Sequence, residues 1–195
     1  MAAVFIFSTC NKDNASLTNT VKTLDVKEGS GKVSIDVVKL ELWDASLCKS
    51  VAIAEGAYSK GVKIALPDNV DSKFLVAFNQ GVIKGATISD QNAKVALAEL
   101  TAYKGGVEAG AFYYGRETDQ YLAKATLLYT DRDVSITGSS SEKDGDETEI
   151  FSYSVYLKKG WNWMYSIEEE SANGKKYSVK LTTSKPSAFK WVFYD

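Results

Sequence analysis

The chain has 195 residues, 45% of them hydrophobic and 25% charged, which is typical of a globular protein with one large or two small domains. Its 23 basic and 25 acidic residues give a net charge of −2, so no broad positive surface is expected and a nucleic acid is excluded as a partner. The lack of histidine removes the commonest general base and the commonest zinc ligand.

The first ten residues form an apolar run that ends at Ser8-Thr9-Cys10, and a polar segment, residues 11–19, follows. This pattern is typical of a bacterial lipoprotein signal, in which Cys10 becomes the lipid-carrying first residue. No Lys or Arg precedes the apolar run, so either the start codon lies further upstream or residues 4–7 form a buried first strand. We predict a lipoprotein leader and tether over residues 1–25.

The leader resembles that of surface lipoproteins from Bacteroidota-type bacteria, in which a short polar stretch with Lys and Asp follows the export cysteine; here it is Asn11-Lys12-Asp13. Residues 157–162, Leu-Lys-Lys-Gly-Trp-Asn, are similar to a turn in small uncharacterised β-sandwich proteins of the same group. The resemblance implies a cell-envelope protein, lipid-anchored at the outer membrane or extracellular, that contacts the membrane through its lipid alone.

Beyond the leader, apolar and polar residues alternate with a period of two between turn residues, which predicts an all-β protein. The run over residues 32–43 shifts its phase by one residue after Val37, which predicts a β-bulge. Cys48 follows it and is expected to be buried and unpaired, since lipidation would occupy the other cysteine. Further strands of the first half are predicted at residues 62–66, 74–78 and 112–114. The alanine content of residues 92–103 favours a helix, but their alternation favours a strand, which we predict there.

The second half alternates more regularly, and its turns are clearer. Lys158-Lys159-Gly160 predicts a hairpin between flanking strands, and Asn173-Gly174 predicts another. The acidic segment 142–149 is predicted to be a mobile loop; Ca²⁺ could suit its oxygen ligands, but its spacing differs from known calcium loops and Lys143 interrupts it, so a solvated loop is favoured. The strands are predicted at residues 121–129, 134–137, 151–157, 161–167, 177–183 and 189–193.

These features predict an antiparallel β-sandwich, built as two small modules at residues 26–117 and 118–195 with a boundary near residues 115–119. One continuous sandwich is the alternative. The last predicted strand, with Phe189, Trp191 and Phe193 on one face, is expected to be inserted in a sheet.

Trp161 and Trp163 lie two residues apart on a predicted strand, as two rings stacking on sugars would. Both share their face with Tyr165 and Ile167, a continuous apolar set that favours a role in the core.

The opposite face of that strand is the surface left for a ligand. It carries Asn162 and Met164 beside Tyr156 of the preceding strand, if the two strands pair. Trp43 stands at a strand end, where an exposed position and sugar stacking are plausible. We therefore predict Trp43, Tyr156, Asn162 and Met164 as ligand-binding residues, and we predict no catalytic residue, cofactor or metal.

Three classes of function remain. The leading one is a non-catalytic cell-surface lipoprotein with a binding or accessory role, whose partner is a polysaccharide or another surface protein. The second is a fimbrillin-like structural subunit, since those subunits also resemble lipoproteins with two β-sandwich modules. The third is a carboxylate-based glycoside hydrolase, which needs two carboxylates about 5 to 10 Å apart, and no carboxylate pair here stands in a recognisable motif.

Overall fold

The computed structural model describes residues 21–27, 34–78, 83 and 85–194, and within them the chain is all-β apart from one turn of 3-10 helix, as predicted. None of the helical structure in these residues is long or apolar enough to cross a membrane. Cys10 and most of the predicted leader lie outside the described residues. The elements are β1 (Thr23–Lys27), β2 (Val37–Asp44), β3 (Lys49–Ala57), β4 (Gly61–Ala65), η1 (Ser72–Phe74), β5 (Val76–Ala77), β6 (Ala86–Ile88), β7 (Lys94–Lys104), β8 (Val107–Thr118), β9 (Tyr121–Thr130), β10 (Val134–Asp144), β11 (Glu147–Leu157), β12 (Gly160–Glu170), β13 (Lys176–Thr182) and β14 (Lys190–Tyr194).

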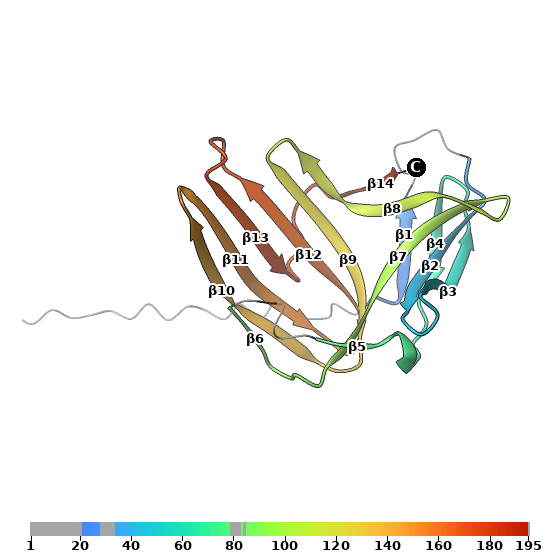
Figure 1. The fold of residues 1–195 in the computed structure, drawn as a ribbon. Coiled ribbons are helices and arrows are strands. Elements are labelled where there is room, and N and C mark those ends of the chain that lie inside the picture. Colours follow the sequence, from blue (N-terminus) through green and yellow to red (C-terminus); the bar gives the residue numbers. More distant parts are fainter. Residues whose placement is uncertain (1–20, 28–33, 79–82, 84, 195) are drawn as a thin grey trace, which may run out of the picture.

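One long sheet carries most of these strands, in the order β3-β2-β7-β8-β9-β12-β13-β11-β10-β6. β14 pairs with β8 and β5 pairs with β7, while β1 and β4 form a separate antiparallel pair. The long sheet bends sharply at β7, β8 and β9, so that β10 to β13 diverge from β1 to β4 (Figure 1). The molecule therefore has two regions joined by a shared sheet.

In the first region, β1 and β4 cover one face of the sheet made by β2, β7, β8 and β14, which gives two packed layers. The alternating apolar residues of β1 and β4 meet those of the facing strands in one buried cluster, compatible with a β-sandwich. Val26, Val38, Leu40 and Ala102 have no exposed surface. We call β1, β4 and the sheet that they cover the packed region.

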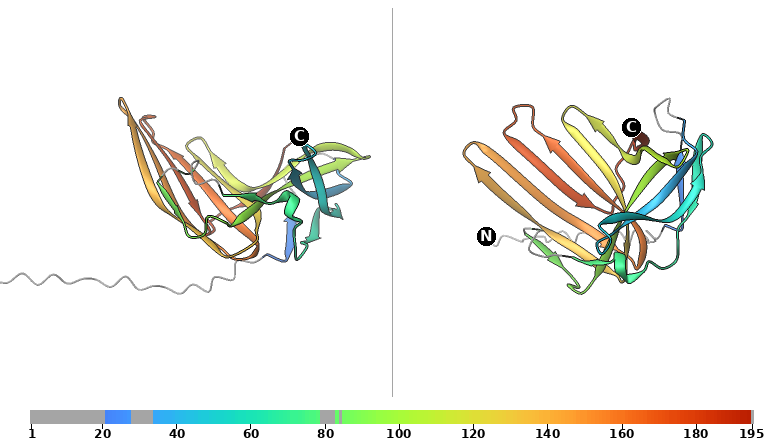
Figure 2. Two further views of the ribbon diagram at one scale, coloured as in Figure 1. Left: turned by 60° about the horizontal axis from the view of Figure 1, so that its bottom comes forward. Right: turned by 45° about the vertical axis from the view of Figure 1, so that its right-hand side comes forward.

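The second region is a single sheet with a smaller core beneath one end. The segment containing β6 folds back under β9, β10 and β11, and Ile88 and Ala93 pack there against Leu128, Ile136 and Val155. Beyond this core the paired strands continue as hairpins, seen at the upper left of Figure 1 and in both views of Figure 2. No residue in ranges 138–153 and 166–181 is buried. We call these two ranges the open hairpins.

The bend is a three-way junction of strands. β7 pairs with β9 over Val95–Ala98 and with β8 from Leu100 onward, while β8 pairs with β9 from Tyr114 onward. The predicted boundary between residues 117 and 118 falls inside the β8–β9 hairpin, where Thr118 pairs with Tyr121, so it does not separate two sheets. Because β14 returns to β8, residues of the second predicted module also complete the packed region.

The hairpin predicted at residues 158–160 is wrong, although the turn exists. β13 inserts between β11 and β12, antiparallel to β12 and parallel to β11. Although only a short link joins β11 to β12, these two strands are therefore not neighbours in the sheet. The hairpin predicted at Asn173-Gly174 is confirmed, because Glu170 pairs with Tyr177 across it.

The acidic segment predicted as a loop is mostly strand. Pairing of β10 with β11 runs to Asp144 and Glu147, so only Gly145 and Asp146 form the turn. Glycine suits this turn because its φ is +57°. Cross-strand hydrogen bonding thus overrides the local polar composition.

Cys48, the β-bulge and the start of the first strand all differ from their predictions. Cys48 is exposed in the turn after β2, where its φ is +48°, and not buried. A bulge does occur in this hairpin, but the extra residue is Ile53 of β3, between the pairs Leu40–Ala54 and Glu41–Ala52. The predicted tether overlaps β1, which begins at Thr23.

Candidate functional site

A cleft of about 640 Å³ lies between β1 and β14, close to the bend of the long sheet. This volume lies within the range of about 300 to 1,000 Å³ that is usual for small-molecule sites. We call it the aromatic cleft. Its lining residues are Thr23, Leu24, Asp25, Lys27, Tyr114, Trp163, Lys185, Phe189, Lys190 and Trp191.

Strand register brings the four rings of the cleft together from three elements and the segment before β14. Trp191 of β14 pairs with Tyr114 of β8, and their ring centroids are 4.9 Å apart. Phe189 meets the edge of Tyr114 at 5.4 Å, and Trp163 of β12 meets Trp191 at 6.2 Å. The indole N–H of Trp191 donates to the carbonyl oxygen of Asp25 at 3.0 Å, which ties β14 to β1.

Neighbouring residues outside the lining hold the aromatic rings of the cleft in place. Tyr114 pairs with Ala125, which in turn pairs with Tyr165, so the small alanine separates two aromatic positions. Phe189 packs edge-on against buried Tyr165 at 5.5 Å. Burial raises the pKa of Tyr165 to about 12, so its phenol stays neutral near pH 7. The aromatic side of the cleft is therefore preformed and uncharged.

The charges of the cleft come from three lysines and one aspartate. Lys27 Nζ lies 2.7 Å from Asp25 Oδ2, and this hydrogen bond lowers the pKa of the Asp25 carboxyl against the opposing effect of desolvation. The ammonium of Lys185 lies 4.9 Å from the centre of the Tyr114 ring, a cation–π distance. A ligand in the cleft would therefore meet aromatic faces and ammonium groups together.

A second hollow of about 410 Å³ opens at the three-way junction. It shares Tyr114, Trp163 and Trp191 with the aromatic cleft, so these rings separate the two hollows. Leu97 and Glu99 of β7 also line it.

The two tryptophans of the predicted pair have different surroundings. Trp161 is 3% exposed, and its indole N–H donates to the carbonyl oxygen of Pro67 at 2.8 Å, so its predicted core position is confirmed. Trp163 is only half-buried, at the margin of the core, where it lines the cleft. Trp43 is 56% exposed as expected, but it does not line the cleft.

The other three predicted site residues do not form one surface. Asn162 has no exposed surface, and its side chain accepts from Lys158 N–H and donates to the carbonyl oxygens of Lys158 and Gly160. This amide fixes the turn between β11 and β12 and has no face left for a ligand. Met164 of β12 packs against the smaller core. Tyr156, 44% exposed, lies on β11, and β13 separates β11 from β12.

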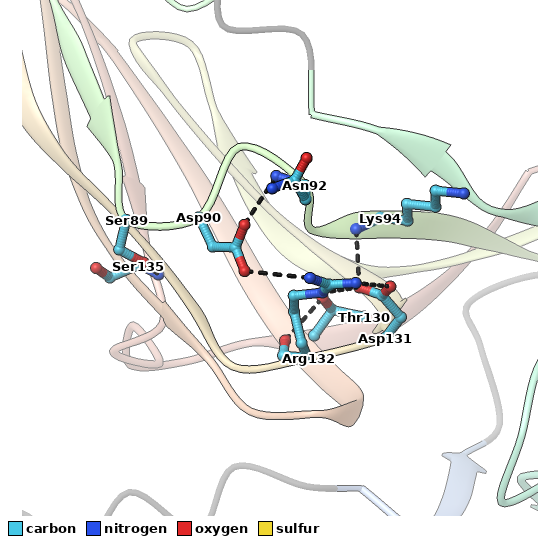
Figure 3. A network of polar contacts seen from close by, with 8 residues as sticks. All are labelled: Ser89, Asp90, Asn92, Lys94, Thr130, Asp131, Arg132 and Ser135. Atoms are coloured by element: carbon cyan, nitrogen blue, oxygen red, sulfur yellow. Dashed lines mark hydrogen bonds and ion pairs between the residues drawn. The ribbon is translucent and has the colours of Figure 1, made fainter.

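A separate polar network joins the turn after β9 to the segment before β7 (Figure 3). Arg132 bonds Asp131 and Asp90, and Asp131 also accepts from the backbone N–H of Lys94 at 2.9 Å. Desolvation raises the pKa of Asp131, but the hydrogen bonds from Arg132 and Lys94 outweigh it and lower that pKa overall. Because these groups satisfy one another, the network is structural.

No group of three or more potential metal-ligating side chains gathers anywhere in the described ranges. No protein-family model matches the chain, and comparisons with curated proteins and with solved structures give no significant match. Function therefore has to be inferred from the cleft itself.

Sequence reasoning missed most of the cleft. The alternation of the last strand correctly placed Trp191 and Phe189 on one face but could not show that β14 faces β1. Lys185 lies in a turn segment without any motif. The one usable signal was Trp163, whose strand was already a candidate for sugar stacking.

Proposed function

We propose that this chain is a non-catalytic glycan-binding protein of the cell surface and that the aromatic cleft is its binding site. The observation that carries the proposal is the gathering of Tyr114, Trp163, Phe189 and Trp191 around one hollow with polar groups at its rim. Flat ring faces suit the apolar faces of pyranose rings, while neighbouring polar groups bond the hydroxyls.

The geometry of the cleft supports binding without a large conformational change. Its rings come from strands of one continuous sheet and from the segment leading into β14, and ring contacts between 4.9 and 6.2 Å hold them against one another. A preformed wall loses little side-chain entropy when a ligand binds.

The chemistry of the cleft favours binding over hydrolysis. A carboxylate-based glycosidase needs two carboxyl groups, an acid and a base or nucleophile. Among the described residues Asp25 is the single carboxylate of the lining, and it is paired with Lys27. The cleft therefore supplies stacking and hydrogen bonding but lacks the second carboxylate of that mechanism.

The cell-surface part of the proposal is supported by the sequence before the fold. Cys10 follows an apolar run and precedes a polar stretch, as in a lipoprotein signal. Expression with a complete leader in a bacterium fed an alkyne-labelled fatty acid should label the protein, and Cys10→Ala should abolish the label. Equal labelling of both forms would refute lipidation at this cysteine.

Glycan binding is tested by screening residues 21–195 on a glycan array and measuring affinities of the retained sugars by calorimetry. Trp163→Ala and, separately, Phe189→Ala should weaken binding about tenfold or more, as expected for aromatic anchors in a pocket. Trp43→Ala is the matched control, because Trp43 is exposed and is not among the lining residues. Binding lost only in Trp43→Ala would move the site to that residue, and no retention of any glycan would refute the proposal.

A further inference from the structure

We infer that the aromatic cleft selects acidic saccharides, in which a carboxylate on the sugar meets the lysine side chains while the sugar ring stacks on the aromatic wall. This inference rests on the proposed glycan-binding function and names its ligand class. It follows from the distribution of charge in the lining.

The positive charge of the cleft is a local departure from the rest of the chain. The whole protein has a net charge of −2, yet the described part of the lining holds Lys27, Lys185 and Lys190 against Asp25 alone. Lys63, which is not among the lining residues, pairs with Asp25 across the β1–β4 ladder and, after the hydrogen bond from Lys27, also lowers the pKa of that carboxyl. A carboxylate ligand would reduce this excess charge.

Two of these lysines form no ion pair with a carboxylate of the described residues. Lys27 is paired with Asp25, but the ion pairs within the described residues include neither Lys185 nor Lys190. Lys185 instead holds its ammonium over the Tyr114 ring. A cation placed over an aromatic face keeps much of its capacity to bond an anion from its other side.

The same position explains why the ligand would be a sugar acid and not a small inorganic anion. The lining sets the half-buried rings of Trp163 and Phe189 beside the ammonium groups, so a ligand that fills the cleft must offer an apolar face and a negative charge together. A uronate ring has both. Lysine suits such a ligand because a single point charge does not demand one fixed carboxylate geometry.

The test compares sugars that differ only in charge. Tetramers of galacturonate and guluronate and the hyaluronan tetrasaccharide are each titrated by calorimetry beside their carboxyl-reduced, neutral forms. We expect at least one acidic member to bind about tenfold more tightly than its neutral partner. This preference should fall when salt is raised to about 0.5 M, because screening weakens attraction between partly exposed charges.

Substitutions of Lys185 test whether this side chain causes the preference for acidic sugars. Lys185→Gln should remove most of the acidic preference and Lys185→Glu should reverse it, whereas Lys185→Arg should retain it. Lys49→Gln makes the same charge change on exposed β3 and should leave the preference for acidic sugars unchanged. Near-ultraviolet circular dichroism confirms that each variant is folded.

The outcomes separate the two proposals. Equal binding of acidic and neutral partners, or a preference that survives Lys185→Glu in a folded protein, would overturn the selection of acidic saccharides and leave glycan binding intact. No binding of any acidic or neutral sugar would overturn both.

Discussion

The packed region and the open hairpins are made from strands with the same alternation, yet one is buried and the other is not. In the packed region β1 and β4 supply a second layer, and Val26 and Val38 are fully buried. The open hairpins belong to the same sheet, but none of their residues is buried. Alternation therefore specifies a strand, whereas burial depends on whether another layer covers it.

The open hairpins must be stabilised largely within the sheet. Phe151 of β11 pairs with Val179 of β13 and with Ser140 of β10, and all three side chains are only half-buried. Such cross-strand pairs contribute about 0.2 to 1 kcal/mol each, far less than a buried side chain in a two-layer core. The comparison predicts a large difference in local stability between the two regions.

Hydrogen exchange should show the largest difference. Backbone amides of β10 and β11 within the open hairpins should be at least about 100-fold less protected than those of β2 and β7, because local opening there exposes little additional apolar surface. Exchange mass spectrometry with peptide resolution measures this. Equal protection would mean that the two regions open together.

A matched pair of substitutions tests the same contrast in free energy. Leu40→Ala removes a side chain with no exposed surface and should destabilise the fold by about 3 kcal/mol. Ile150→Ala, at a half-buried position of β11 within the open hairpins, should cost about 1 kcal/mol or less. Urea unfolding of both variants gives the two values, and similar losses would contradict the division into regions.

Two glycines offer a backbone version of the test. Gly110 has a φ of +140°, and a methyl group there would collide with the carbonyl oxygen of Tyr194, so Gly110→Ala should disturb the β8–β14 pairing and cost at least about 2 kcal/mol. Gly145 has a φ of +57° but open space around it, so Gly145→Ala should cost only about 1 kcal/mol. Thermal unfolding compares the two, and a larger loss at Gly145 would refute the prediction.

The smallest effect concerns the network that joins the segment before β7 to the turn after β9. Because the pKa of Asp131 is lowered in the folded protein, its ionised form stabilises the fold above the unfolded pKa of about 3.9, and this contribution is lost as the pH falls through the folded value. Asp131→Asn should cost up to about 1 kcal/mol at pH 6 and less at pH 3. Urea midpoints at both pH values test this, and a cost that does not shrink in acid would contradict it.

The sequence predicted features that depend on neighbouring residues. Alternation located most strands, and Asn173-Gly174 located a hairpin because that pair suits the backbone of a tight turn. The short link at Lys158-Lys159 looked similar, yet β13 separates the strands that it joins. Pairing between distant segments is a property of the whole sheet, so no local pattern could have excluded a hairpin there.

The same limit applies to the candidate site. Exposure of Trp43 was predictable from its place at a strand end, whereas the burial of Asn162 follows from hydrogen bonds to a turn that the sequence misassigned. The aromatic cleft requires Trp191 to lie beside Asp25, which is 166 residues away along the chain. Composition carries no information about that contact.

The return of β14 to β8 also determines when the packed region can form. Synthesis proceeds from the N-terminus, so Trp191 and Phe193 leave the ribosome after every strand that they pack against. Until then β1, β2 and β4 lack part of their core, and folding must wait for contacts of long sequence separation. A nascent chain that stops before residue 190 is therefore expected to remain a substrate for chaperones.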